Sequence, residues 1–378
     1  MPANGAVSLG VDGRSNSFVT LAADGDRVAA VWLASSDSGN DVFVAMSDDG
    51  GARFAAPVRV NDLPGDAAGN GEQPPRVVLH DRTVAVVWIS KRQGVSGVRA
   101  AQSADGGRSF SAARTISPEG VTGARGWESV AIADDGMVHA AWLDGRNAAP
   151  MAADHHDHGV MRQDIVHAMW RAGEPVVESP VADNVCFCCK TGVVTHGRDV
   201  FVVWRHLFEG GVRDIAVARS ADGGRTFGSP VRVSADNWKI DACPDDGPSL
   251  AVEGNGTLHV AWPTLLSDSG QPHMAIFETI SMDGGATFTA RARVDASTTG
   301  ASHPRMAVSR DGVRAIVWDE AAAAGRQAMI RVAGGDARTL AGGGTSYPAI
   351  APTPEGFVVG WNEQAGGRPV VGVRRVGP

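Results

Sequence analysis

The sequence has little charge, one tyrosine and four cysteines in 378 residues. Charged side chains make up 20% of it, and 34 basic against 42 acidic groups give a formal net charge of −8. This acidic balance argues against a nucleic acid or an anionic membrane as a partner, because both bind to basic faces. No apolar run approaches the roughly 20 residues that a membrane-spanning helix needs. The first residues, MPANGAVSLG, also lack the basic and apolar regions of a signal peptide.

Glycine and hydrophobic residues, by contrast, are abundant. The chain has 48 glycines and 20 prolines, a larger share than the roughly 12% of average proteins. Hydrophobic residues reach 43%, which is enough for a large core and argues against a disordered chain. We therefore expect a globular protein with many turns.

An apolar run that ends in tryptophan recurs seven times along the chain. Successive copies are 56, 54, 62, 58, 56 and 43 residues apart, which indicates a structural repeat. Because these tryptophans follow apolar strands at one register, we expect them to pack between repeats. They are Trp32, Trp88, Trp142, Trp204, Trp262, Trp318 and Trp361.

A second motif, S-x-D-G-G-x-x-F, follows four of these strands. Its serine and aspartate oxygens can accept hydrogen bonds from turn N–H groups, and its glycines allow positive φ. We expect its aspartates to stabilise turns rather than to act in a functional site. They are Asp49, Asp105, Asp222 and Asp283.

Each repeat predicts four short antiparallel strands, because runs of Val, Ile and Ala alternate with Gly, Asp and Asn turns. A four-stranded repeat of about 50 residues is typical of a propeller blade. We therefore predict an all-β fold, a single closed seven-bladed β-propeller over residues 1–378. Only one strand follows Trp361 in the last repeat, so the segment 6–9 is expected to supply its fourth strand and close the ring.

The S-x-D-G-G-x-x-F motif resembles the Asp box, or BNR repeat, of the sialidase superfamily, and the resemblance covers nearly the whole chain. It implies a propeller whose Asp boxes lie at outer-strand turns, far from the pocket. Sialidases have six blades, which is the alternative to the seven tryptophan repeats counted here.

One face of such a propeller should carry the function. Loops that enter the inner strands and loops that leave the tryptophan strands share this face, and here they are long and irregular, whereas the opposite turns are short. All four cysteines and an unusual group of histidines fall on it. These residues are Cys186, Cys188, Cys189, Cys243, His155, His156, His158, His206 and His303.

Three interpretations of this group stay open. Thiolates and imidazoles together suit a soft transition metal, copper before zinc, with the histidines of residues 155–158 covering a core made by the other six ligands. Alternatively, an even number of cysteines fits disulfides in an oxidising compartment, and adjacent blades would bring Cys243 close to residues 186–189. Covalent haem attachment is disfavoured, because Cys186-x-x-Cys189 is followed by Lys190 and not by histidine.

The family resemblance also implies a second function, that of a sialidase-type exo-glycosidase. Sialidases use a tyrosine nucleophile activated by a glutamate, and arginines that bind the substrate carboxylate. Tyr347 starts the last inner strand, where the nucleophile of the family lies, and Glu128 is its expected partner. The family's Arg-Ile-Pro motif is absent, because Ser17-Phe18-Val19 stands in its place. Guanidinium groups suited to the carboxylate are those of Arg76, Arg125, Arg205 and Arg305.

We accordingly predict an exported propeller, periplasmic or secreted and monomeric, that binds a soft metal at this face. A redox-active ion would make it an oxidoreductase. The alternatives are the exo-glycosidase and a non-catalytic propeller that binds a small molecule, a glycan or a protein.

Overall fold

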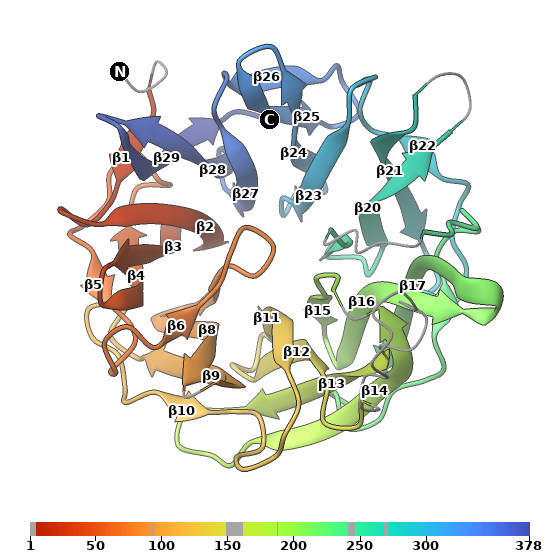
Figure 1. Cartoon of the computed structure of the whole chain (residues 1–378), viewed down its shortest axis with the longest axis horizontal. Coiled ribbons are helices and arrows are strands. Elements are labelled where there is room, and N and C mark those ends of the chain that lie inside the picture. Colours follow the sequence, from red (N-terminus) through yellow and green to blue (C-terminus); the bar gives the residue numbers. More distant parts are fainter. Residues whose placement is uncertain (1–4, 93, 149–161, 187, 241–245, 268–270) are drawn as a thin grey trace.

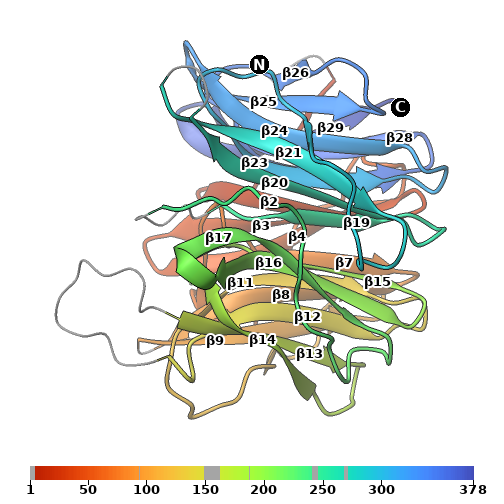
Figure 2. The same ribbon diagram turned by 90° about the vertical axis from the view of Figure 1, so that its right-hand side faces the viewer.

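The computed structural model describes residues 5–92, 94–148, 162–186, 188–240, 246–267 and 271–378. In these ranges the chain is all-β apart from a short 3-10 turn, η1 (Glu209–Gly211). By their pairing, the described strands group into seven antiparallel units of four, arranged in a ring (Figure 1). From the side, the strands run from one face of the ring to the other (Figure 2). No helix of the described part has the length and apolar character needed to cross a membrane.

Each unit begins with an inner strand beside the central axis, followed by the tryptophan strand and two further strands. The first three units are β2 (Ser15–Asp24), β3 (Arg27–Ser36), β4 (Gly39–Ser47) and β5 (Val58–Arg59); β7 (Arg76–His80), β8 (Thr83–Arg92), β9 (Val95–Ser103) and β10 (Arg114–Thr115); and β11 (Arg125–Ile132), β12 (Val138–Asp144), β13 (Arg162–Trp170) and β14 (Val177–Cys186). The next three are β15 (Gly192–His196), β16 (Asp199–Phe208), β17 (Val212–Ser220) and β18 (Val231–Arg232); β19 (Ser249–Val252), β20 (Leu258–Leu266), β21 (His273–Ser281) and β22 (Ala292–Arg293); and β23 (Ala301–Val308), β24 (Arg314–Ala322), β25 (Gly325–Val332) and β26 (Arg338–Ala341).

The seventh unit joins the two ends of the chain. It consists of β27 (Ser346–Thr353), β28 (Gly356–Ala365), β29 (Arg368–Val376) and the N-terminal β1 (Val7–Leu9). β1 pairs antiparallel with β29, with Val7 opposite Val373. A short bridge, β6 (Ala67–Ala68), pairs with both β4 and β8 and so links the first two units. Together with the family and neighbours described below, this architecture confirms the predicted all-β propeller class.

The core lies between neighbouring units. All seven repeated tryptophans have 0% of their surface exposed. Trp88 of the second unit, for example, packs in one cluster with Val31 and Val44 of the first. Burying side chains of this size stabilises by more than the roughly 1.5–3 kcal/mol of a smaller apolar residue, so each repeated tryptophan makes a large contribution to the contact between units.

The Asp boxes are turns on the outer strands. Ser47 Oγ donates to Asp49 Oδ1 at 2.8 Å and accepts from Gly51 N at 2.9 Å, while Asp49 Oδ1 accepts from Arg53 N at 2.8 Å. Gly51 has a φ of +87°, and a Cβ there would lie 2.8 Å from Val358 Cγ2. The same serine–aspartate bond recurs at Asp105, Asp222 and Asp283, so these carboxylates are engaged in the turns.

Candidate functional site

Four inner strands begin with a β-bulge at one end of the central channel, here called the channel mouth. The pairing shifts register near the start of β2, β11, β23 and β27. Each bulge holds one non-glycine residue in the left-handed region, with φ between +49° and +65°: Phe18, Trp127, His303 and Tyr347. Such a conformation costs on the order of 1–3 kcal/mol and is concentrated at functional sites. Bulges re-aim side chains, and the rings of His303 and Tyr347 stack with their centroids 4.2 Å apart.

Three cysteine sulfurs come together where β14 leads towards β15. Cys186 Sγ lies 3.6 Å from Cys189 Sγ and 3.9 Å from Cys188 Sγ. The three side chains are buried against one another and against Trp127. Cys186 and Cys189 are free thiols. The mouth therefore has a compact group of sulfur atoms, of which the free thiols of Cys186 and Cys189 suit a soft metal ion.

Two arginine side chains lie close to this sulfur group. Arg213 Nη1 lies 3.8 Å from Cys186 Sγ, and the buried Arg205 acts on both free thiols. A hydrogen bond from Cys189, together with these arginines, lowers the pKa of Cys186 to about 6. Burial, by contrast, raises the pKa of Cys189. The neighbouring arginines thus favour the thiolate form at this pair, whereas burial opposes it.

The predicted histidine ligands do not join the sulfurs in the described part of the chain. His206 Nδ1 accepts a hydrogen bond from Trp204 Nε1 at 3.3 Å, and burial lowers the pKa of His206. His303 has both ring nitrogens engaged by carboxylates, Nδ1 by Asp319 at 2.9 Å and Nε2 by Glu72 at 3.0 Å. Three further predicted ligands and one cysteine lie outside the described residues: His155, His156, His158 and Cys243.

A buried ionic network fills the channel mouth. Lys190, with no exposed surface, places Nζ 2.5 Å from Asp246 Oδ1 and 3.5 Å from Glu72 Oε2. The backbone N–H of His303 donates to Asp246 Oδ2 at 2.6 Å. Burial alone would lower the pKa of His303, but hydrogen bonding to Asp319 and the nearby negative charges raise it. The network thus joins side chains from the second, fourth, fifth and sixth units, and Asp319 links it to the seventh by accepting from the backbone N–H of Tyr347 at 2.6 Å.

Tyr347 lies at the edge of this network. Burial, followed by the charges of Glu72, Asp319 and Asp246, raises the pKa of Tyr347 to about 12. The predicted partner Glu128 is elsewhere in the mouth: it is fully buried, Arg76 is the charge that acts on it, and burial raises its pKa to about 7. Among the carboxylates, the charge of Glu72 has the largest effect on the pKa of Tyr347.

The four predicted arginines divide into two pairs. Arg76 and Arg305 line a channel hollow of about 170 Å³, and burial together with the charge of Arg305 lowers the pKa of Arg76 to about 9. Arg125 and Arg205 instead bind main-chain oxygens, such as Val121 O at 2.9 Å and Pro263 O at 2.9 Å respectively. The second pair therefore anchors neighbouring main-chain segments, and of the four arginines only Arg76 and Arg305 line this hollow.

Sequence reasoning missed Glu72, Lys190 and Asp246. Each lies in a loop just before an inner strand. Each is also within four residues in sequence of a predicted site residue, namely Arg76, Cys189 and Cys243 respectively. A search for charged residues at the start of every inner strand would have found them. Their mutual contact could not have been found, because it depends on closure of the ring.

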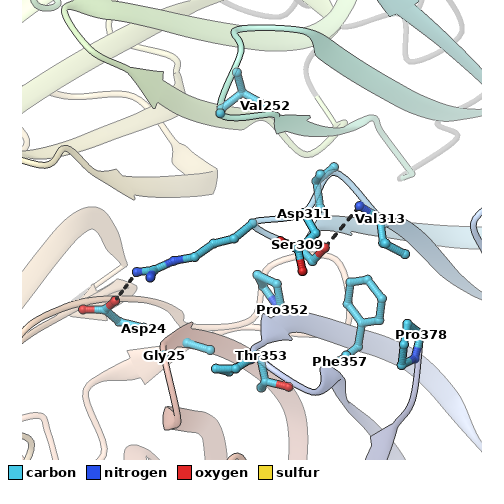
Figure 3. A pocket seen from close by; sticks show the side chains of 16 residues that line it. Asp24, Gly25, Val252, Ser309, Asp311, Val313, Pro352, Thr353, Phe357 and Pro378 are labelled. Atoms are coloured by element: carbon cyan, nitrogen blue, oxygen red, sulfur yellow. Dashed lines mark hydrogen bonds and ion pairs between the residues drawn. The ribbon is translucent and has the colours of Figure 1, made fainter.

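Another hollow of the described surface lies at the other end of the channel. Its volume is about 560 Å³, and it is lined by turns between inner and tryptophan strands, including Gly25, Pro352 and Phe357 (Figure 3). Its charged contact is an exposed one, Arg310 to Asp24 at 3.8 Å. No cluster of metal-binding or nucleophilic side chains converges on it among the residues described, so the channel mouth is the better candidate.

The sequence matches the model of the BNR repeat-like domain family over residues 26–359. The chain belongs to this family. The sialidase-superfamily resemblance inferred from the Asp boxes is thereby confirmed. No curated protein matches the sequence.

Solved structures of BNR-type and related propellers share the fold. The chain is similar to an ulvan lyase of polysaccharide lyase family PL25, with a TM-score of 0.60, 10% identity, and 98% and 96% of the two chains covered. It is also similar to the leech intramolecular trans-sialidase, with a TM-score of 0.50, 12% identity, and 89% and 79% covered. A Penicillium chrysogenum α-L-arabinanase gives a TM-score of 0.50 at 12% identity, with 97% and 98% covered. At these identities the likeness shows the fold alone.

Proposed function

We propose that this BNR propeller binds a thiophilic metal ion, Cu(I) in preference to Zn(II), at Cys186 and Cys189. The observation that carries the proposal is a buried pair of free thiols whose sulfurs lie 3.6 Å apart. Two sulfurs that bind one ion at about 2.3 Å lie roughly 3.8 Å apart at a tetrahedral angle. An ion bound at that angle would fit with shifts of only tenths of an ångström, whereas a linear two-coordinate Cu(I) would require the sulfurs to separate by about 1 Å.

Charge and burial support a thiolate–metal site. Two thiolates and one Cu(I) carry a net charge of −1, which the neighbouring Arg205 and Arg213 can compensate in a buried place. Without such compensation, burial of the anion would be costly. Cys186 and Cys189 are 4% and 1% exposed, so the site is also shielded from water.

The donor set favours copper over zinc. Structural zinc sites use four nitrogen or sulfur ligands, whereas Cu(I) is selected by soft sulfur ligands and needs fewer of them. In the described part of the chain the ligand group consists of sulfurs, and neither His206 nor His303 belongs to it. The copper ligands proposed here are thus a subset of those expected from the sequence.

Competitive titration tests this function. Reduced, anaerobic wild-type protein should take about one equivalent of Cu(I) from a chromogenic chelator. Cys186→Ser and Cys189→Ser should each weaken binding by more than the roughly 10–100-fold that outer-shell partners contribute. His206→Ala serves as the control and should bind as the wild type does. Equal binding by wild type and both serine variants would refute the site.

A second measurement covers the case in which a serine variant does not fold. X-ray absorption of copper-loaded wild type should show sulfur scatterers at about 2.2–2.3 Å. Bound Cu(I) should also protect the peptide that contains residues 186–189 from alkylation. A first shell made only of nitrogen and oxygen would refute the proposal without any variant.

We also propose that the protein is exported, periplasmic or secreted. In an oxidising compartment free thiols persist when they are buried or metal-bound, which fits the shielded pair. Fractionation of the native host with a specific antibody tests this location, and recovery only with the cytoplasm would refute it.

A further inference from the structure

A five-residue segment crosses the channel mouth. We call residues 69–73, Gly69 to Gln73, the strap; it connects β6 with β7 and reaches towards the centre of the ring (Figure 1). Its tip, Asn70, is exposed, whereas Gly71 and Glu72 are buried. Burial of a charged residue within a loop is uncommon and calls for a specific set of partners.

The strap holds its own shape. Asn70 Oδ1 accepts from the N–H groups of Glu72 at 2.8 Å and Gln73 at 3.0 Å, which is an Asx turn. Gln73 Oε1 accepts from Trp127 N at 3.3 Å, and Pro74 and Pro75 follow directly. The turn is therefore a compact unit that begins at Gly69.

The strap lies directly on the tyrosine ring. A Cβ at Gly71 would lie 2.1 Å from Tyr347 Cζ, so only glycine permits this approach. The same ring stacks on His303. The strap thus covers the Tyr347 ring, which in turn stacks on His303.

The strap carboxylate sits among cations from other units. Glu72 lies 3.0 Å from His303 Nε2 and 3.5 Å from Lys190 Nζ, and the positive charge of Arg305 also acts on it. Among the described residues neither Glu72 oxygen has a hydrogen bond of good geometry, although both are buried. An ion pair of this kind compensates desolvation incompletely, so the carboxylate is held less firmly than its burial suggests.

We propose that Glu72 is an intramolecular pseudo-ligand, and that an external organic carboxylate binds to Lys190, His303 and Arg305 when the strap lifts. The three cations come from the fourth and sixth units, whereas the strap belongs to the second, so lifting it leaves their framework intact. The aromatic faces of His303 and Tyr347 would then border the bound molecule. This site is separate from the proposed metal ligands and does not depend on them.

Two variants open the strap by different means. Glu72→Gln removes the charge and keeps the shape, whereas Gly71→Ala pushes the strap off Tyr347 and keeps the charge. The matched controls are Glu119→Gln, at an exposed glutamate, and Gly254→Ala, where a Cβ meets nothing within 4 Å. D-glucuronate is the probe, and D-glucose is its uncharged counterpart.

Calorimetry gives the decisive comparison. The apparent affinity equals the intrinsic affinity multiplied by the fraction of molecules in which the strap is open. Both strap variants should therefore bind glucuronate about 10-fold or more tightly than wild type and controls do. Glucose should not bind to any of them. The proposal is overturned if the strap variants bind glucuronate no tighter than wild type, or if glucose binds equally well.

Hydrogen exchange of the wild type tests the same idea without a substitution. Saturating glucuronate should increase deuterium uptake in the peptide that contains residues 69–73, while glucose leaves it unchanged. Unchanged or reduced uptake with bound glucuronate would mean that the strap stays closed, and would overturn the proposal.

Discussion

Lys190→Met tests the ionic network of the channel mouth most directly. Lys190 has no exposed surface and places its ammonium between Asp246 and Glu72. The substitution leaves Asp246, which is 4% exposed, without its closest counter-ion. Removing one partner of a buried ion pair costs about 3–5 kcal/mol, because the remaining charge is uncompensated.

The expected thermal shift follows from the length of the chain. Unfolding entropy scales with residue number and amounts to about 0.8 kcal/mol/K for 378 residues. A loss of about 4 kcal/mol should then lower the Tm by roughly 5 °C. Differential scanning calorimetry measures this shift, and denaturant unfolding followed by tryptophan fluorescence provides an independent value.

A double variant separates lost charge from lost shape. Lys190→Met combined with Asp246→Asn removes both charges, so it should recover at least half of the lost stability. Lys239→Met, at an exposed lysine, is the control and should change stability by no more than about 0.5 kcal/mol. A Lys190→Met protein that melts within about 1 °C of wild type would refute the reasoning, as would a double variant no more stable than the single one.

Three further predictions concern buried groups elsewhere. Burial raises the pKa of Glu128 from 4.5 to about 7, so the folded state holds the proton more tightly, and stability should fall by about 3 kcal/mol as pH rises from 4.5 to 7. Glu128→Gln should reduce this slope in melts between pH 4.5 and 7.5, and an equal slope in both proteins would contradict the assignment. The single tyrosine, Tyr347, should titrate near pH 12 by absorbance at 295 nm, and a midpoint near 10 in folded protein would show that it is solvated. Gly224→Ala should cost about 1 kcal/mol or more, because φ is +86° and the new Cβ would lie 2.5 Å from His167 Cε1. Gly254→Ala is the matched control, and equal melting of the two alanine variants would contradict this steric argument.

The architecture could be read from the chain because its causes are local and repeated. Each tryptophan ends an apolar strand, and each S-x-D-G-G-x-x-F turn makes its own hydrogen bonds. The strands and the turn of a repeat can therefore be predicted from the residues of that repeat alone. The confirmed propeller class and BNR family rest on these two signals. The pairing of β1 with β29 also follows from a count of strands, since the last repeat has one too few.

The candidate site could be predicted only in part. The local sequence places Cys186, Cys188 and Cys189 within reach of one another, and the structure brings their sulfurs together. The local sequence does not show that His206 and His303 stay apart from these sulfurs, because the partners of a side chain depend on its neighbours in space. His303 is engaged by Glu72 and Asp319, and His206 by Trp204.

The sequence by itself determined the repeating unit, its strand order and the face on which unusual residues gather. Hydrophobic periodicity and turn chemistry act over a few residues, so their signal is complete within each repeat. Only the tertiary structure decided which loops meet across the channel. Glu72, Lys190 and His303 belong to the second, fourth and sixth units, and they come into contact because the ring closes. Charge pairing over such separations leaves no periodic trace in the sequence, and the strap and its network became visible only in the folded molecule.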